Sequence, residues 1–225
     1  MSVSELRGMS LFSGLTEIEL QQIDHLAAYR LYSKNEMIVF EGEPESSFFI
    51  ILQGRVKISR YTEDGKEAIC SFLGEGEFFG ETCVFPAQFW QSSIVTLEAV
   101  RTMHLYRDDL LKLMQNLPLL NINLLREMTI RLRRRNAQIK SLTTHNAMGK
   151  VASTILRLVD DLGISRSGRI ELDNLPTHRD IASMIGTSRE TISRVMRHLK
   201  QEGFIRKENG RLVICDYNSF RQAFY

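Results

Sequence analysis

The chain has 225 residues, of which 43% are hydrophobic and 25% charged, and its formal net charge is +2. These values are ordinary for globular proteins, and the length allows two moderate cores, so we expect two domains. No stretch approaches the ~20 apolar residues of a membrane helix, and the first residues lack a basic segment followed by a long apolar run. We therefore expect a soluble cytoplasmic protein.

Cysteine and histidine usage argues against a metal centre. Cys70, Cys83 and Cys215 are widely separated and show no CxxC spacing, and the five histidines are equally scattered. We interpret the cysteines as reduced and mostly structural, because zinc and iron–sulfur sites need clustered ligands. The sequence also lacks a nucleophile elbow, a P-loop and a dinucleotide fingerprint, so we expect no enzyme.

Charge is unevenly distributed along the chain. Residues 146–225 hold 13 Lys+Arg against 9 Asp+Glu, a net +4, and residues 1–145 hold 16 against 18, a net −2. This basic excess agrees with nucleic-acid binding but does not imply it by itself.

The first region predicts one helix followed by short strands. Thr16 and Glu19 have capping-box spacing at the start of a helix over residues 16–28. Asp64-Gly65 is the best hairpin signal. Short strands with glycine turns favour an antiparallel barrel or roll over βαβ units. The strand-like segments are MIVFE, SFFIILQG, RVKISRY, EAICSFLG and SSIVTLEAV.

The second region, residues 106 to about 144, predicts a helix with a heptad pattern. Two rows recur every seven residues: Leu125, Leu132 and Ile139, and Met128, Arg135 and Leu142. This favours a dimer interface, and the alternative is a helix packed on its own domain. Arg135 breaks its row, because a guanidinium in an apolar seam is costly unless an anion satisfies it. It either snorkels to solvent or reaches an anionic ligand of the strand-rich domain.

The third region predicts a winged helix-turn-helix. A helix in MGKVASTILRLVDDLG and a strand hairpin in RSGRIELDNLP precede two further helices. Thr177 caps the first of these, and Gly186 provides the left-handed turn to the second. Asn209-Gly210 between two strand-like segments predicts a β-wing. The first helix buries Ile181, Met184 and Ile185, and Ala182 leaves room for a neighbouring helix.

The second helix, in TSRETISRVMRHLKQEGFI from Thr187 to Ile205, has two distinct faces. Either Thr187, with Glu190 in a capping box, or Ser188 caps it. Ile192, Val195, Met196 and Leu199 form a buried stripe, and Arg189, Glu190, Ser193, Arg194 and Arg197 share an exposed arc. We interpret this arc as a surface that reads another molecule.

Three motifs in succession carry a resemblance that covers nearly the whole chain: GEFFGE (Gly76–Glu81), the long helix, and SRETISR (Ser188–Arg194). The chain resembles the cyclic AMP receptor protein/Fnr (CRP/FNR) family of bacterial transcription regulators. The resemblance implies an α+β fold with an N-terminal antiparallel β-roll (residues 1–117), a dimerisation helix (118–145) and a C-terminal winged helix-turn-helix (146–225). It also implies a homodimer on a pseudo-palindromic DNA operator with GTGA or TTGA half-sites, and RNA polymerase as a partner.

The resemblance also assigns DNA contacts. Arg forks suit guanine O6 and N7, and a Glu carboxylate accepts from the cytosine amine. Contacts to phosphates position the protein without specifying sequence. The residues that match base readers are Arg189, Glu190, Ser193 and Arg194, and those that match phosphate contacts are Thr177, His178, Arg179, Ser188 and Thr191.

The effector pocket departs from the cyclic AMP-binding pattern. Gly80 and Glu81 match the ribose side, but Gln91 stands where an Arg grips the cyclic phosphate, and a neutral amide cannot replace that charge. The remaining matching positions are Ser92, Ser93, Arg135 and Asn136, the last two in place of a Thr-Ser pair. Three readings stay open: a different anion, nucleotide-like or an organic acid, bound with Arg135; no ligand and control by abundance; or a cyclic nucleotide despite the missing Arg.

Two further alternatives concern sensing and class. Cys83 is either a thiol sensor or an inert buried cysteine, and Trp90 is a packing residue rather than a stacking platform. The clustered cysteines of oxygen-sensing Fnr proteins are absent, which disfavours an iron–sulfur switch. A regulatory cyclic-nucleotide module of an enzyme or channel would leave SRETISR and the wing without a role.

Overall fold

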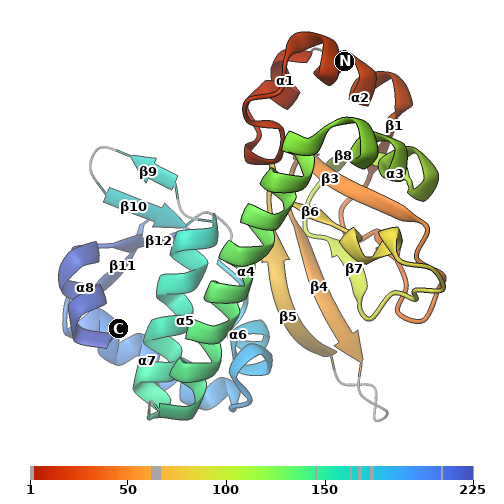
Figure 1. Cartoon of the computed structure of the whole chain (residues 1–225). Coiled ribbons are helices and arrows are strands. Elements are labelled where there is room, and N and C mark those ends of the chain that lie inside the picture. Colours follow the sequence, from red (N-terminus) through yellow and green to blue (C-terminus); the bar gives the residue numbers. More distant parts are fainter. Residues whose placement is uncertain are drawn as a thin grey trace. The chain divides into compact units, whose positions relative to one another are not determined.

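The computed structural model describes residues 3–61, 67–144, 146–162, 164–166, 169–172, 175–208 and 210–224, without the side chains of residues 3, 137–144 and 160–166 (Figure 1). The chain divides into two compact units, Met1–Arg133 and Arg134–Tyr225.

The first unit contains two four-stranded antiparallel sheets, ordered β1-β8-β3-β6 and β2-β7-β4-β5 (Figure 1). β3 is buried along nearly its whole length because apolar clusters cover both of its faces. The predicted antiparallel roll is therefore confirmed. The strands are β1 (Ala28–Tyr32), β2 (Met37–Val39), β3 (Ser47–Gln53), β4 (Val56–Tyr61), β5 (Glu67–Leu73), β6 (Phe78–Phe79), β7 (Ser93–Thr96) and β8 (Val100–Tyr106).

The strand-like segment SSIVTLEAV contains β7, and its last residue, Val100, begins β8. β7 pairs with β2 and β4 in one sheet, whereas β8 pairs with β1 and β3 in the other. The chain changes sheets between Thr96 and Val100, and side-chain alternation carries no signal for such a switch. The Asp64-Gly65 turn lies outside the described residues, but β4 and β5 on either side of it pair antiparallel.

Helices flank the sheets of the first unit. Thr16 and Glu19 form the predicted capping box: the Glu19 N–H donates to Thr16 Oγ1 at 3.3 Å, and the Thr16 N–H to Glu19 Oε2 at 2.7 Å. The helix predicted from Tyr106 onward is interrupted at Leu117, directly before Pro118, because proline favours the first turn of a new helix. The helical elements are α1 (Val3–Arg7), η1 (Ser10–Phe12), α2 (Glu17–Leu26), η2 (Glu81–Val84), α3 (Arg107–Asn116) and α4 (Pro118–Thr144).

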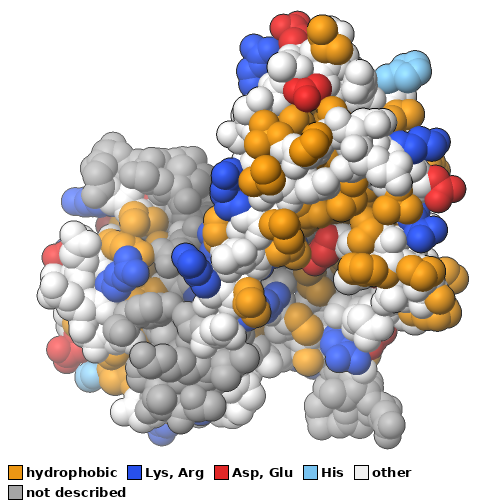
Figure 2. Space-filling model, in the orientation of Figure 1, with side chains coloured by type: hydrophobic (Ala, Val, Ile, Leu, Met, Phe, Trp, Pro, Cys, Tyr) orange, Lys and Arg blue, Asp and Glu red, His pale blue; other side chains and the backbone are white. Residues whose placement is uncertain are grey.

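α4 has one covered face and one exposed apolar face. Met128 packs against the core cluster that the helices of the unit share with β3 and β8, so its row does not belong to an exposed seam as the heptad pattern suggested. Leu125 and Leu132 are 66% and 62% exposed, and Figure 2 shows hydrophobic side chains over this helix. The side chains of Ile139 and Leu142 lie outside the described residues. No helix in the described ranges is long and apolar enough to cross a bilayer.

The second unit is a helix-turn-helix with an antiparallel sheet of order β11-β12-β10-β9. The predicted hairpin is formed by β9 and β10, and the predicted wing by β11 and β12. Asn209 lies outside the described residues, and Gly210 has the positive φ, 82°, that the turn signal predicted. The elements are α5 (Ala147–Leu162), β9 (Ile164–Arg166), β10 (Arg169–Leu172), α6 (His178–Ile185), α7 (Arg189–Gln201), β11 (Ile205–Glu208), β12 (Arg211–Ile214) and α8 (Tyr217–Phe224).

Candidate nucleic-acid interface and effector site

The turn between α6 and α7 fixes the start of the second helix. Gly186 ends α6 with φ 65° and ψ 46°, the left-handed conformation that the sequence predicted. Ser188 is the N-cap of α7, and its Oγ accepts from the Thr191 N–H at 3.1 Å. The Thr187 N–H instead bonds to the Ala182 carbonyl. Ser188, not Thr187, therefore caps the helix.

α7 presents the two predicted faces. Its apolar stripe is buried: Ile192, Val195, Met196 and Leu199. Its polar arc points away from that core: Arg189, Glu190, Arg194 and Arg197 are exposed, and Ser193 is half-buried. The helix ends at Gln201, and Ile205 already begins β11, so the predicted helix to Ile205 is too long. Gly203, with φ 79°, reverses the chain between them.

Glu190 lies in the first turn of α7. Hydrogen bonding from its own backbone amide and from Ser188 lowers the pKa of its carboxyl below the ordinary value. The group is therefore ionised at neutral pH and acts only as an acceptor. A cytosine amine is the base-edge group that matches it.

The residues expected to contact phosphates lie at the starts of both helices. Thr177 caps α6 in a capping box with Asp180, and Ser188 caps α7. Thr177, Arg179 and Ser188 are exposed, and Thr191 is half-buried. Backbone amides and the helix dipole favour anions at such helix starts.

His178 also lies at the start of α6, and it joins the two helices. Its Nδ1 lies 2.9 Å from the Ser193 Oγ, so a predicted phosphate contact and a predicted base reader bond to each other. Burial, followed by the charges of Arg189, Lys200 and Lys207, lowers the pKa of the imidazole.

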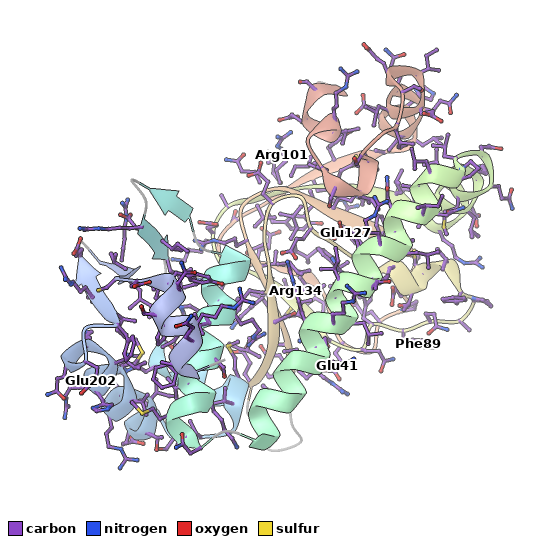
Figure 3. The ribbon with its side chains drawn as sticks, turned by 60° about the vertical axis from the view of Figure 1, so that its left-hand side comes forward. Glu41, Phe89, Arg101, Glu127, Arg134 and Glu202 are labelled. Carbon is purple, nitrogen blue, oxygen red and sulfur yellow. The ribbon has the colours of Figure 1, made fainter. Side chains whose placement is uncertain are left out.

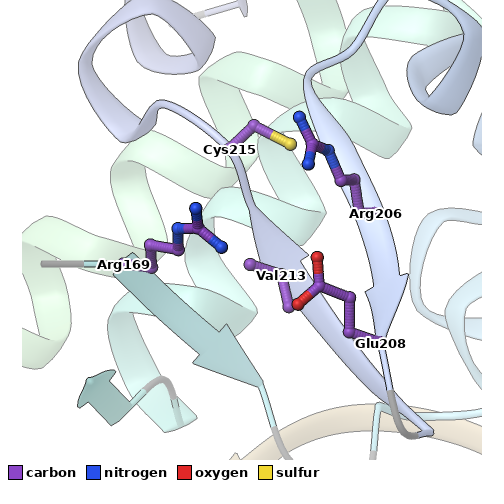
Figure 4. Close-up of a pocket in the computed structure, with 5 residues that line it drawn as sticks. All are labelled: Arg169, Arg206, Glu208, Val213 and Cys215. Carbon is purple, nitrogen blue, oxygen red and sulfur yellow. The ribbon is translucent and has the colours of Figure 1, made fainter. Parts of the chain in front are cut away.

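A small open pocket lies on the wing sheet, lined by Arg169, Arg206, Glu208, Val213 and Cys215 (Figure 4). Its accessible space is about 40 Å³, far below the ~300 Å³ of small-molecule sites. It is therefore not a nucleotide site.

The GEFFGE segment places Gly80 in close contact with its surroundings. Gly80 has φ 84°, and a Cβ there would lie 2.4 Å from the Ser47 carbonyl and 2.8 Å from the Trp90 ring. Trp90 is buried against Phe49 and Phe79. Its role is thus packing, as expected.

In the run that matches the phosphate-gripping pair, Gln91 bonds within its own loop and Ser93 bonds to the segment after β2. The exposed Gln91 amide donates to the Phe89 carbonyl at 3.1 Å. Ser93 is buried, and its Oγ accepts from the Glu41 N–H at 3.0 Å; Ser92 is half-buried. The two partner residues, Phe89 and Glu41, are labelled in Figure 3. The hydrogen bonds of Gln91 and Ser93 thus go to the backbone at Phe89 and Glu41, and not to Glu81.

Arg131, which the sequence reasoning missed, connects α4 to the GEFFGE segment. Its Nη2 donates to the Phe78 carbonyl at 2.6 Å, its guanidinium lies 4.0 Å from the Phe78 ring centroid, and its Nη1 lies 3.8 Å from Glu81 Oε2. Arg135 and Asn136 are exposed. Arg131 lies one turn before Arg135 and on the same face of α4 as Met128. This spacing was the sequence signal that could have identified Arg131 as a residue facing its own domain.

Cys83 is fully buried. Desolvation by burial, with the charge of Glu45 next, raises the pKa of its thiol to about 12. Since the thiolate is the reactive form, this residue suits an inert packing role better than a sensor. Within the described part of the chain, no group of three or more metal-ligating side chains is assembled.

Known proteins match both halves of the chain. Residues 29–117 match the model of the cyclic nucleotide-binding domain, and residues 149–223 that of the Crp-like helix-turn-helix domain. A CRP-like cAMP-activated global transcriptional regulator of Mycobacterium tuberculosis is 31% identical over 207 residues, which cover 92% of this chain and 89% of that protein. The cyclic AMP receptor protein of Thermus thermophilus is 31% identical over 209 residues, covering 93% and 94%.

A solved structure supports the fold. FixK2 from Bradyrhizobium japonicum superposes with a TM-score of 0.73 at 22% identity, covering 87% of this chain and 96% of that one. The chain belongs to the CRP/FNR family of bacterial transcription regulators. It is a regulator with a DNA-binding helix-turn-helix and a cyclic nucleotide-binding domain, and not an enzyme.

Proposed function

We propose that this regulator works in the cytoplasm as a homodimer that reads a pseudo-palindromic operator with GTGA- or TTGA-like half-sites and acts on RNA polymerase. The polar arc of α7 carries the proposal: it is exposed opposite a fully buried stripe, at a position fixed by the Ser188 cap and followed by the wing. A helix held in this way enters the major groove with its N-terminal residues at base edges.

The four base readers of the proposal are Arg189, Glu190, Ser193 and Arg194. The two arginines offer forked donors for guanine, and ionised Glu190 accepts from a cytosine amine. Contacts to phosphates come from the helix starts, through Thr177, His178, Arg179, Ser188 and Thr191. The basic residues around them add a salt-dependent, sequence-independent attraction.

The exposed apolar face of α4 supports the homodimer. Ile122, Leu125 and Leu132 are all more than half exposed and lie along one side of the helix. Apolar side chains at this spacing bury themselves against the same face of a second copy in a coiled coil. The second subunit also provides the second recognition helix that a palindrome needs.

For the effector, we propose a polar ligand other than cyclic AMP that enters the β-roll beside Glu81. The Ser71 Oγ is buried without a hydrogen-bond partner among the described residues, and its cross-strand neighbour Ile58 packs on the interior cluster of the roll. A buried hydroxyl in this state costs about 1–3 kcal/mol, which a polar ligand would recover. Gln91 lacks the charge that a cyclic phosphate requires.

Cyclic AMP is the second candidate, because the domain model and the names of the two relatives favour it. A titration of the purified protein with cyclic AMP, other nucleotides and organic acids separates the two. We expect no saturable cyclic AMP binding in the wild type and a gain in Gln91→Arg, which restores the guanidinium. Micromolar cyclic AMP binding by the wild type would favour the second candidate.

Selection of bound duplexes from a random pool tests the DNA-binding proposal. We expect a symmetric consensus with two half-sites about one helical turn apart, and a steep loss of affinity with added salt. Sedimentation of the protein at the same concentration gives the oligomeric state. A monomer, or equal retention of selected and scrambled duplexes, would contradict the proposal.

A further inference from the structure

The hydrogen bond between His178 and Ser193 crosses from the first to the second helix of the helix-turn-helix. The two side chains are both half-buried, with Nδ1 and Oγ 2.9 Å apart. Ser193 lies on the same side of α7 as the exposed Arg189 and Arg194. Its hydroxyl is therefore shared between an imidazole and the surface assigned to DNA.

A serine hydroxyl has one proton to donate and two lone pairs to accept with. If His178 Nδ1 is unprotonated, the Ser193 O–H donates to it, and only lone pairs remain for a base. If Nδ1 carries a proton, it donates to Ser193 Oγ, and the O–H is released to donate elsewhere. The two states of the ring thus give Ser193 opposite hydrogen-bonding character.

We propose that His178 is a specificity-determining residue, which sets whether the Ser193 hydroxyl accepts from or donates to the base that it faces. This rests on the proposed DNA-binding function. An accepting Ser193 favours the amines of adenine and cytosine, and a donating Ser193 favours guanine O6 and N7 or thymine O4. His178 itself need not touch the base.

The surroundings of His178 favour the neutral form of the ring in the free protein. The charged groups that act on the ring from packed elements are Arg189 and Lys200 of α7 and Lys207 of β11. Arg179 and Asp180 are its neighbours on α6, where Asp180 is occupied in the capping box. Burial, followed by these three cations, lowers the pKa of the imidazole and disfavours its charged form in the free protein. Below its pKa the ring becomes an imidazolium, and both of its nitrogens then donate.

The test uses the full-length protein and its selected operator. Relative affinities for the four base pairs are measured by competition at the position that Ser193→Ala affects most. The two pH values are about 5.0 and about 7.5, and the lower one allows for the lowered pKa of His178. We expect the wild type to shift by about tenfold from amine-bearing to acceptor-bearing bases at the lower pH, the size of one such contact. His178→Gln and Ser193→Ala should each abolish the shift.

The control is His198→Gln. His198 is an exposed histidine on α7, the helix of Ser193, and this variant should retain the pH-dependent shift in base preference. The comparison of the wild type at two pH values does not depend on any variant folding. Equal base preference of the wild type at both values, or a shift that survives in folded His178→Gln, overturns the proposal. Failure to select any operator would instead count against the DNA-binding function on which it rests.

Discussion

Arg131 and Glu81 form an ion pair, with Nη1 and Oε2 3.8 Å apart, that ties α4 to the turn at the end of the GEFFGE segment. The same guanidinium bonds to the Phe78 carbonyl and lies over the Phe78 ring. Glu81 is thus paired with a cation of the protein itself. A ligand that bonds to Glu81 would compete with Arg131 and change how α4 is held, which is a route for a population shift.

Replacing Arg131 should loosen this connection. We expect Arg131→Ala to lower the free energy of unfolding by about 1–3 kcal/mol, because a charged hydrogen bond and a cation–π contact are lost together. Urea unfolding followed by circular dichroism measures this. Arg133→Ala removes an exposed arginine two residues later on the same helix and should change stability by less than about 0.5 kcal/mol. Equal effects of the two substitutions would argue against a specific role for Arg131.

The exposed face of α4 should control assembly. We expect Leu125→Glu combined with Leu132→Glu to weaken self-association at least about 100-fold, because the carboxylates would meet across a two-fold interface. Analytical ultracentrifugation measures the dissociation constant. Glu127→Gln, on the same helix, is the matched control and should sediment like the wild type. A double variant that remains dimeric would place the interface elsewhere.

Glu190→Ala should relax base selection at one position in each half-site. The loss of an ionised acceptor is expected to lower discrimination there by about 1–3 kcal/mol while leaving the other positions selective. Binding-site selection with the variant reads this out. The comparison variant Glu202→Ala removes an exposed carboxylate beyond the end of α7. Unchanged selectivity in Glu190→Ala would exclude it as a base reader.

Gly80→Ala should destabilise the β-roll. The added Cβ would lie 2.4 Å from the Ser47 carbonyl, at a φ of 84° that non-glycine residues rarely adopt, and we expect a loss of at least about 3 kcal/mol. Gly76→Ala is a close control because it has φ 81° and no atom within 4 Å of the new Cβ. It should cost only about 1 kcal/mol. Thermal unfolding of the two variants separates steric clash from backbone strain.

Local signals predicted much of the fold. The Thr16–Glu19 capping box, the Thr177 cap, the left-handed Gly186 and the buried stripe of α7 follow from residues within a few positions of one another, and the structure confirms them. The switch of sheets between β7 and β8 was missed because strand pairing is decided by distant partners. The heptad rows also failed in part, since Met128 faces its own domain.

In the candidate site, too, features within one helix were predicted and contacts between helices were not. Spacing along α7 separated the exposed arc from the buried stripe, but it could not show that His178 and Ser193, 15 positions apart, share a hydrogen bond. On α4, attention to an arginine inside a heptad row selected Arg135, whereas contact with Phe78 and Glu81 belongs to Arg131. Contacts between elements depend on three-dimensional packing that one-dimensional periodicity does not contain.

The caps of α6 and α7 are hydroxyls, Thr177 and Ser188, rather than carboxylates. Aspartate would stabilise a helix start equally well, yet it would add to the negative charge that Asp180 and Glu190 already place in these first turns, where a polyanion is expected to approach. A hydroxyl cap accepts from a backbone amide without adding a charge of its own. Both helix ends can thus stay closed while the protein associates with its nucleic acid, so neither needs to fray on docking.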